Sequence, residues 1–242
     1  MAISVLENIK KAKKEGKKLL AVLLDPDKLD LETITIYIKE LNKSHADYIF
    51  VGGSKVDNGL TDTFVTVIKK QSKIPIVLFP GDYRQISPNA NAILFLSLLS
   101  GRNPEYLIEQ QVQSIPSLMH LKLEIIPTGY ILIDGGTITS TQKVSNTLPI
   151  PQNRIELIRN TSLAAEFLGK QLVYLEAGSG AKQHVSADII KTVSTACSVP
   201  VIVGGGLKTK KDIDKAYENG ADLIVIGTAF ENDKTILKEL MS

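Results

Sequence analysis

The chain has 242 residues but no tryptophan, one cysteine and three histidines. Because Cys197 is the single cysteine, an intramolecular disulfide framework is excluded. We expect Cys197 to be a buried, apolar side chain, and a protein without disulfides fits a reducing compartment such as the cytoplasm. His45, His120 and His184 do not have the spacing of metal ligands. The sequence therefore gives no indication of chemistry based on cysteine or histidine.

Excess charge and long apolar runs are also absent. The formal net charge is +2, which is too small to indicate binding to nucleic acid or to an anionic membrane surface. The longest apolar stretch, residues 92–99, is much shorter than the roughly 20 residues of a membrane span. We therefore expect no nucleic-acid partner and, at most, peripheral contact with a membrane.

Eight short apolar segments recur along the chain, and helical periodicity fills most of the intervals between them. Apolar runs without alternation are typical of parallel strands that are buried on both faces. The predicted strands are residues 19–24, 48–51, 75–79, 92–96, 123–133, 172–175, 200–203 and 223–226. The alternation of strands and helices, and a length close to the ~250 residues of a typical barrel, predict that residues 1–242 form one (β/α)8 TIM barrel.

Helical periodicity is clear at residues 31–44, 153–169 and 186–197. Ser186 and Thr209 are expected to be N-caps, and Gly169 and Gly220 are expected to end helices. Two segments interrupt the pattern. Residues 80–91 are short and rich in proline, which predicts an irregular or missing crossover helix after the third strand. Residues 134–151 are predicted to be a long polar loop, of the kind that often forms a lid or a binding loop.

Glycines gather where the last three predicted strands end, in residues 173–181, 201–206 and 224–228. Glycine lets backbone N–H groups approach a ligand closely. The loops after the seventh and eighth strands of a β/α barrel are a recurrent phosphate site. These N–H groups, with the hydroxyls of Ser179 and Thr228, would bind a phosphate dianion. The alternative is that the glycines serve only to make tight turns.

Acidic residues at two strand ends suggest catalysis. Glu176 would take a proton from a substrate hydroxyl, although a structural ion pair with a lysine is the alternative. Tyr174 would bind substrate or simply fill the barrel. Asp25 and Ser54 would offer oxygen ligands to Mg²⁺, which typically takes only one or two carboxylates from a protein. Alternatively, Asp25 would cap the turn that follows, a role that suits Asp27 better.

Several of these segments also match a known family. Leu24-Asp-Pro-Asp-Lys28, Val51-Gly-Gly-Ser54, Glu124-Ile-Ile-Pro-Thr-Gly-Tyr130 and Tyr174-Leu-Glu-Ala-Gly-Ser-Gly180, with the two terminal glycine turns, resemble geranylgeranylglyceryl phosphate synthases of the GGGP/PcrB family. The resemblance runs in order over nearly the whole chain. It implies a prenyltransferase of ether phospholipid biosynthesis that forms a homo-oligomer, either a dimer or a hexamer.

In the reaction that the resemblance implies, the sn-3 hydroxyl of sn-glycerol 1-phosphate attacks the first carbon of geranylgeranyl diphosphate, and diphosphate leaves. Asp25 and Ser54 would bind Mg²⁺, and Glu176 and Tyr174 would be catalytic. The residues implied to bind sn-glycerol 1-phosphate are Tyr174, Leu175, Glu176, Ala177, Gly178, Ser179, Gly180, Gly205, Gly206, Gly227 and Thr228. The apolar residues 92–99 and the open region near Ile86 and Ala90 would line a channel for the prenyl tail.

Other readings of the same residues stay open. A bacterial branch of the family uses heptaprenyl donors and often carries a lysine where this chain has Leu23, so Leu23 favours the geranylgeranyl donor. An FMN-dependent oxidoreductase would use the same glycine cradle, and so would a barrel that binds phosphate without catalysis. A phosphosugar isomerase or an aldolase would need an acid/base pair or a lysine inside the barrel, and no lysine lies at an interior strand position.

Overall fold

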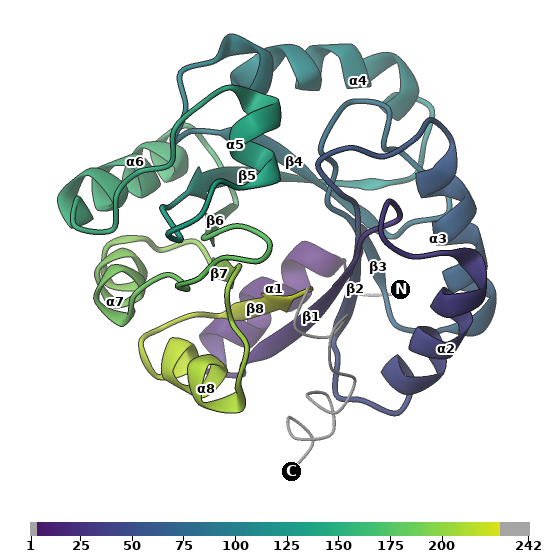
Figure 1. Cartoon of the computed structure of the whole chain (residues 1–242), viewed down its shortest axis with the longest axis horizontal. Coiled ribbons are helices and arrows are strands. Elements are labelled where there is room, and N and C mark those ends of the chain that lie inside the picture. Colours follow the sequence, from purple (N-terminus) through teal and green to yellow (C-terminus); the bar gives the residue numbers. More distant parts are fainter. Residues whose placement is uncertain (1–3, 228–242) are drawn as a thin grey trace.

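Eight parallel strands close into a barrel in which each strand is hydrogen-bonded to the next and β8 is hydrogen-bonded to β1 (Figure 1). The computed structural model describes residues 4–227. The strands are β1 (Leu19–Leu24), β2 (Tyr48–Val51), β3 (Ile76–Leu78), β4 (Ala92–Leu98), β5 (Glu124–Leu132), β6 (Leu172–Glu176), β7 (Val201–Gly204) and β8 (Leu223–Ile226). The predicted closed eight-stranded barrel is confirmed, with most strand ends within two residues of their predicted positions.

Helices surround the barrel on its outside (Figure 1). They are α2 (Leu31–Leu41), α3 (Leu60–Gln71), α4 (Gln110–Leu118), which continues a π-helical turn η1 (Glu105–Glu109), α6 (Ile155–Phe167), α7 (Ala187–Ala196) and α8 (Lys210–Glu218). The helices predicted at residues 31–44, 153–169 and 186–197 are therefore confirmed, each slightly shorter than predicted. No helix of residues 4–227 is long and apolar enough to cross a lipid bilayer.

Alternate residues of each strand serve two separate apolar layers. In β1, Leu20, Val22 and Leu24 pack against the surrounding helices, whereas Leu19 and Ala21 belong to the cluster inside the barrel. All five side chains are buried, because a parallel strand in a barrel has protein on both faces. This double burial explains why the strands are visible in the sequence as continuous apolar runs.

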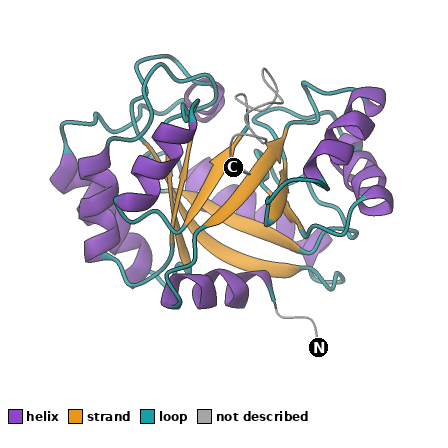
Figure 2. Cartoon of the chain, turned by 90° about the horizontal axis from the view of Figure 1, so that it is seen from below, coloured by secondary structure: helices purple, strands orange, loops and turns teal. Residues whose placement is uncertain are grey.

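Helix α1 (Val5–Lys14) closes the end of the barrel at which the strands begin (Figure 2). Its apolar face joins the interior cluster through Ile9. The Glu124 carboxylate, at the start of β5, accepts hydrogen bonds from the backbone N–H groups of Val5 at 2.7 Å and Leu6 at 3.0 Å. These are two of the unpaired donors at a helix N-terminus. Helix α1 therefore covers one end of the barrel, and the strands end at the opposite mouth (Figure 2).

Several local predictions are confirmed. Thr209 caps α8 in a reciprocal capping box with Asp212. Gly169 and Gly220 follow their helices with φ values of 83° and 103°, a conformation that favours glycine. Ser186 occupies the N-cap position of α7, but its side chain makes no capping hydrogen bond.

Two local predictions need correction. The turn after β1 is capped by Asp25 and not by Asp27, since the Asp25 side chain accepts a hydrogen bond from the Asp27 N–H at 3.1 Å, and α2 has its own cap in Asp30. The polar segment predicted to be a continuous loop contains a short helix, α5 (Ser140–Ser145), which Thr139 caps. By contrast, residues 79–91 form no helix, so the predicted irregular crossover after the third strand is confirmed.

Candidate functional site

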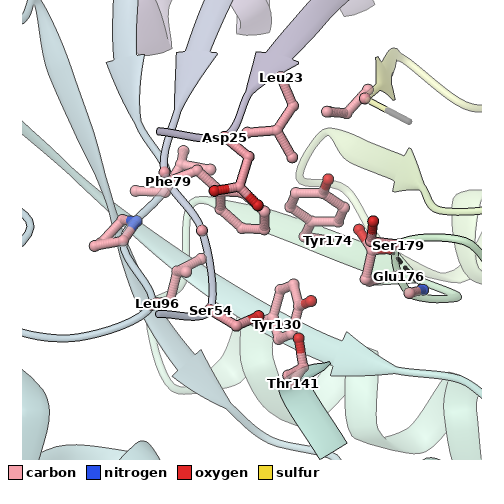
Figure 3. Close-up of a pocket in the computed structure, with 18 of the residues that line it drawn as sticks. Leu23, Asp25, Ser54, Phe79, Leu96, Tyr130, Thr141, Tyr174, Glu176 and Ser179 are labelled. Carbon is pink, nitrogen blue, oxygen red and sulfur yellow. Dashed lines mark hydrogen bonds between the residues drawn. The ribbon is translucent and has the colours of Figure 1, made fainter. Parts of the chain in front are cut away.

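The carboxyl ends of the strands surround a cavity of about 400 Å³ at the open mouth of the barrel (Figure 3). This is the end at which β/α barrels place their active sites. The cavity has a polar side, formed by the ends of β1, β2, β6, β7 and β8, and an apolar side next to β3 and β4. The predicted site residues that line it are Asp25, Ser54, Tyr174, Glu176, Gly178, Ser179, Gly180, Gly205, Gly206 and Gly227.

Two other predicted site residues are not part of this lining. Leu175 and Ala177 are fully buried in the layer between the barrel and the helices, because the alternation of β6 turns their side chains outward. The Ala177 N–H donates to the Gly204 carbonyl at 3.0 Å. Thr228 lies outside the described residues. The side chains of Tyr174 and Glu176 in β6 therefore face the cavity. Those of Leu175 and of Ala177, which follows the strand, face the layer between the barrel and the helices.

At two positions of the site glycine is favoured for two reasons: the backbone φ is positive, and a side chain would collide with a neighbouring residue. Gly205 has φ 79°, and a Cβ at this position would collide with the Glu176 carboxylate. Gly178 has φ 98°, and a Cβ there would collide with Thr139, which begins α5. The loops after β6 and β7 therefore pack tightly around Glu176, and the α5 segment covers the Gly178 turn.

The Glu176 carboxyl is a buried acid with a strongly perturbed protonation equilibrium. Only 6 % of the residue is exposed, and burial raises the pKa of its carboxyl to about 7. A hydrogen bond from the Gly178 N–H at 2.6 Å favours the charged form but does not outweigh burial. An acid that titrates near neutral pH is suited to accept a proton and release it again.

Aromatic rings pack beside this acid. The rings of Phe79 and Tyr174 stack with centroids 5.2 Å apart, and Tyr130 meets Tyr174 edge-on at 5.4 Å. In Figure 3 the Tyr174 ring lies between Asp25 and Glu176. The Tyr174 hydroxyl has no hydrogen-bond partner among the described residues, although it is near enough to Glu176 to favour the charged carboxylate. Burial keeps the pKa of Tyr174 far above its usual value, so its hydroxyl stays protonated and free to donate.

On the opposite side of the mouth, Asp25 and Ser54 line the same cavity. The Asp25 side chain is only 14 % exposed and accepts a hydrogen bond from the Asp27 N–H at 3.1 Å. Burial raises the pKa of the Asp25 carboxyl, against the opposing effect of Lys28. The turn that carries Ser54 packs directly on this carboxylate, since a Cβ at Gly53 would collide with it.

The donor set at this turn fits Mg²⁺ better than a transition metal. No group of three or more His, Cys, Asp or Glu side chains gathers anywhere within residues 4–227. A single buried carboxylate next to a hydroxyl leaves most of the coordination sphere to water and ligand oxygens, which is how Mg²⁺ is usually bound. A cation would also relieve the unfavourable burial of the Asp25 charge.

The apolar side of the cavity extends out of the barrel beside β4. Leu94, Leu96 and Leu98 line it from inside the barrel, and Ile93 and Phe95 line it from the outer face of the same strand. This passage is possible because residues 79–91, which connect β3 to β4, form no helix that would cover it. Ile86 from this segment lines the cavity as well, whereas Ala90 is absent from its lining. The shape provides a polar chamber with an apolar branch.

Several lining residues were not assigned a role from the sequence. Lys28 and Phe79 follow the ends of β1 and β3, and Tyr130 lies inside β5. These positions are the signal in the sequence that points to the three residues. Thr141 of α5 also lines the cavity and interacts with Tyr130. Gln85 supports the Ser54 turn from a buried position that nothing in the local sequence marks.

Known proteins are similar to this chain over nearly its whole length. A sequence profile of the PcrB family matches residues 11–242. The geranylgeranylglyceryl phosphate synthase of Zunongwangia profunda is 53 % identical over 228 residues, which are 94 % of this chain and 97 % of that protein. The protein of the same name from Korarchaeum cryptofilum is 38 % identical over 235 residues, which are 97 % and 95 % of the two chains.

Solved structures give the same result. The (S)-3-O-geranylgeranylglyceryl phosphate synthase of Thermoplasma acidophilum, in complex with its substrate sn-glycerol-1-phosphate, is similar with a TM-score of 0.93 and 33 % identity over 99 % of this chain and 96 % of that one. A mutant tryptophan synthase α-subunit from Pyrococcus furiosus is similar with a TM-score of 0.55 at 14 % identity over 92 % and 94 % of the chains. The latter likeness concerns the fold alone.

Proposed function

Since the chain belongs to the PcrB family, we propose that it transfers the geranylgeranyl group of geranylgeranyl diphosphate to the sn-3 hydroxyl of sn-glycerol 1-phosphate. The product would be geranylgeranylglyceryl phosphate, an ether lipid precursor, together with diphosphate. The observation that carries this proposal is the buried Glu176 carboxyl between a glycine-rich cradle and an acidic turn, in a chain similar to synthases of this name.

The glycine cradle is suited to the phosphate of the acceptor. The turns at Gly178, Gly180, Gly205 and Gly206 all have positive φ and line the mouth, where the Gly178 N–H already donates to the Glu176 carboxylate. Oriented N–H groups and the Ser179 hydroxyl bind phosphate without a full opposing charge. The solved relative with sn-glycerol-1-phosphate supports assigning the glycerol phosphate to this cradle.

Glu176 is placed to activate the acceptor hydroxyl. In the charged form its carboxylate would accept the proton of the sn-3 hydroxyl while the hydroxyl oxygen forms a bond to the first carbon of the prenyl chain. The bond between that carbon and the diphosphate oxygen breaks, and its electron pair leaves with diphosphate. The protonated Tyr174 hydroxyl would donate to the acceptor or to Glu176, which holds the two in register.

Phe79, Tyr130 and Tyr174 would stabilise positive charge on the allylic carbon as the leaving group departs. Their rings form one cluster at the boundary between the polar chamber and the apolar branch. Aromatic faces attract cations by about 0.5–2 kcal/mol or more when water is excluded. We place the reacting carbon beside this cluster, with the tail in the branch along β4.

Asp25 and Ser54 are the residues that would hold Mg²⁺, in agreement with the donor chemistry of their turn. When bound there, the ion would neutralise charge on the diphosphate leaving group. The apolar branch would hold the prenyl tail, and Leu23, where the heptaprenyl branch of the family often carries a lysine, favours a geranylgeranyl donor over a heptaprenyl one. We further propose that the protein works in the cytoplasm as a homo-oligomer, and that it reaches its lipid substrate by peripheral contact with a membrane.

The proposal is tested by incubating purified protein with Mg²⁺, sn-glycerol 1-phosphate and a series of prenyl diphosphates, with products read by mass spectrometry. We expect an ether-linked product from the geranylgeranyl donor, and none with sn-glycerol 3-phosphate or without Mg²⁺. Absence of product with every donor would refute the proposed function. A flavin absorbance spectrum of the purified protein would instead support the oxidoreductase reading.

A further inference from the structure

Lys28 crosses the mouth of the barrel from one side of the site to the other. It lies in the turn after β1, where its Nζ is 3.3 Å from Asp25 Oδ2. The same Nζ donates to Ser179 Oγ at 3.2 Å, although Ser179 is 151 positions away in the loop after β6. Because Ser179 lies between the cradle glycines Gly178 and Gly180, this ammonium group joins the acidic turn to the phosphate cradle.

We propose that Lys28 is a phosphate-binding residue shared by the two substrates of the proposed reaction, and this inference rests on the proposed function. Its ammonium group would donate to the phosphate of sn-glycerol 1-phosphate beside Ser179 and, from the same position, to the diphosphate held at the Asp25 turn. A lysine ammonium has three donors, so one position can serve both anions.

The charges around the cavity explain why such a residue is needed. Among the described lining residues, Asp25, Asp82 and Glu176 are acidic, and only Lys28 and Lys208 are basic. Phosphate and diphosphate groups that enter the same mouth repel one another and these acids. A cation between the two positions favours binding of each anion and lets the acceptor and the donor approach.

An ordinary surface ion pair does not account for the geometry. A pair three residues apart on a turn needs no second partner and contributes little. Here the partner carboxylate is only 14 % exposed, and the lysine also contacts a residue of the phosphate cradle. The Lys28 side chain is 45 % exposed, so its ammonium group can move from Ser179 to an arriving phosphate oxygen without unfolding anything.

The test measures binding of sn-glycerol 1-phosphate alone by titration calorimetry, without metal or prenyl donor. Lys28→Met is expected to weaken this binding by about tenfold or more, because a hydrogen bond to a charged group is lost. Lys28→Arg should restore a part of the affinity. Lys43→Met is the matched control, since Lys43 also pairs with an acid three residues away, Glu40, but does not line the cavity.

Steady-state kinetics then tests the shared role. Lys28→Met is expected to raise the KM of the prenyl diphosphate by several fold, and its melting temperature should match that of wild type. If wild type binds sn-glycerol 1-phosphate and Lys28→Met binds it equally well, the role of Lys28 is refuted while the proposed function stands. An effect on the acceptor alone refutes the shared role. A wild-type protein without affinity for sn-glycerol 1-phosphate refutes the proposed function and this inference together.

Discussion

Gln85 and Gly53 form a two-point amide pair that holds the turn before Ser54. Gln85 Nε2 donates to the Gly53 carbonyl at 2.9 Å, and the Gly53 N–H donates to Gln85 Oε1 at 3.3 Å. Gln85 is only 2 % exposed, in the segment without a helix between β3 and β4. Residues that open the apolar branch therefore also fix the turn that we propose binds Mg²⁺, so the two sides of the cavity are structurally linked.

Replacing Gln85 with Glu should disturb this turn without changing side-chain size. The variant loses the donor to the Gly53 carbonyl and places an acid against that oxygen, which costs about 1–3 kcal/mol. We expect a several-fold increase in the Mg²⁺ concentration that gives half-maximal activity, together with a lower melting temperature. Gln113→Glu, on the exposed face of α4, is the control. A lower melting temperature with an unchanged Mg²⁺ dependence would show that Gln85 has only a structural role.

Glu176→Gln should separate catalysis from binding. The amide keeps the shape of the side chain but cannot accept the hydroxyl proton, and loss of general base catalysis lowers rates by roughly 10²–10⁴-fold. We expect such a decrease in kcat, with the affinity for sn-glycerol 1-phosphate retained in calorimetry. An active variant would mean that another group takes the proton, and a variant that no longer binds the acceptor would mean that Glu176 acts in binding.

The same substitution should stabilise the protein at alkaline pH. The folded state raises the pKa of Glu176 from 4.5 to about 7, so it binds this proton more tightly than the unfolded chain. The stability that this bound proton contributes is fully present below the unfolded pKa of 4.5 and is lost as the pH rises through about 7. The penalty above that pH is at most about 3.5 kcal/mol, at about 1.4 kcal/mol per pKa unit between 4.5 and 7. Glu176→Gln is expected to melt at a higher temperature than wild type at pH ~8, with the difference vanishing near pH ~5.

The pH dependence of wild-type activity should show the same group. Because Glu176 must be charged to accept a proton, kcat/KM should rise with pH and level off above about 7. The phosphate of the substrate also titrates near pH ~6 and would affect the same profile. Its effect is measured on its own from the pH dependence of acceptor binding to the Glu176→Gln variant, which lacks the titrating carboxyl. A wild-type profile that follows only the binding curve would contradict the raised pKa of Glu176.

The sequence predicts the barrel well because each strand is buried on both faces and reads as an apolar run that ends in small or acidic residues. Gly205 could be assigned to the mouth because it directly follows one of these apolar runs. The helix α5 could not be predicted, since Ser140 and its neighbours are weak helix formers. Its position depends on Thr139, which packs against the Gly178 turn from a distant part of the chain.

The supporting residues of the site could not be predicted for a related reason. Lys28 was visible only as part of a motif, and its contact with Ser179 depends on how the barrel closes. Gln85 has no local signal at all, because its partner Gly53 lies 32 positions earlier in the chain. Strand ends can be read from local composition, whereas contacts between the ends of different strands need the fold.

The apolar branch gives a prediction about prenyl chain length. Ile86 lines it, so Ile86→Trp should fill the space that the distal part of a geranylgeranyl tail needs. Overpacking of this kind costs about 1–3 kcal/mol, which corresponds to about 5- to 150-fold in kcat/KM. We expect that loss for the geranylgeranyl donor and little change for farnesyl diphosphate. Ala90→Trp is the matched control, because Ala90 lies in the same segment outside the lining. Equal donor preferences in wild type and Ile86→Trp would show that the tail does not pass Ile86, and the tail would then have to be placed elsewhere along β4.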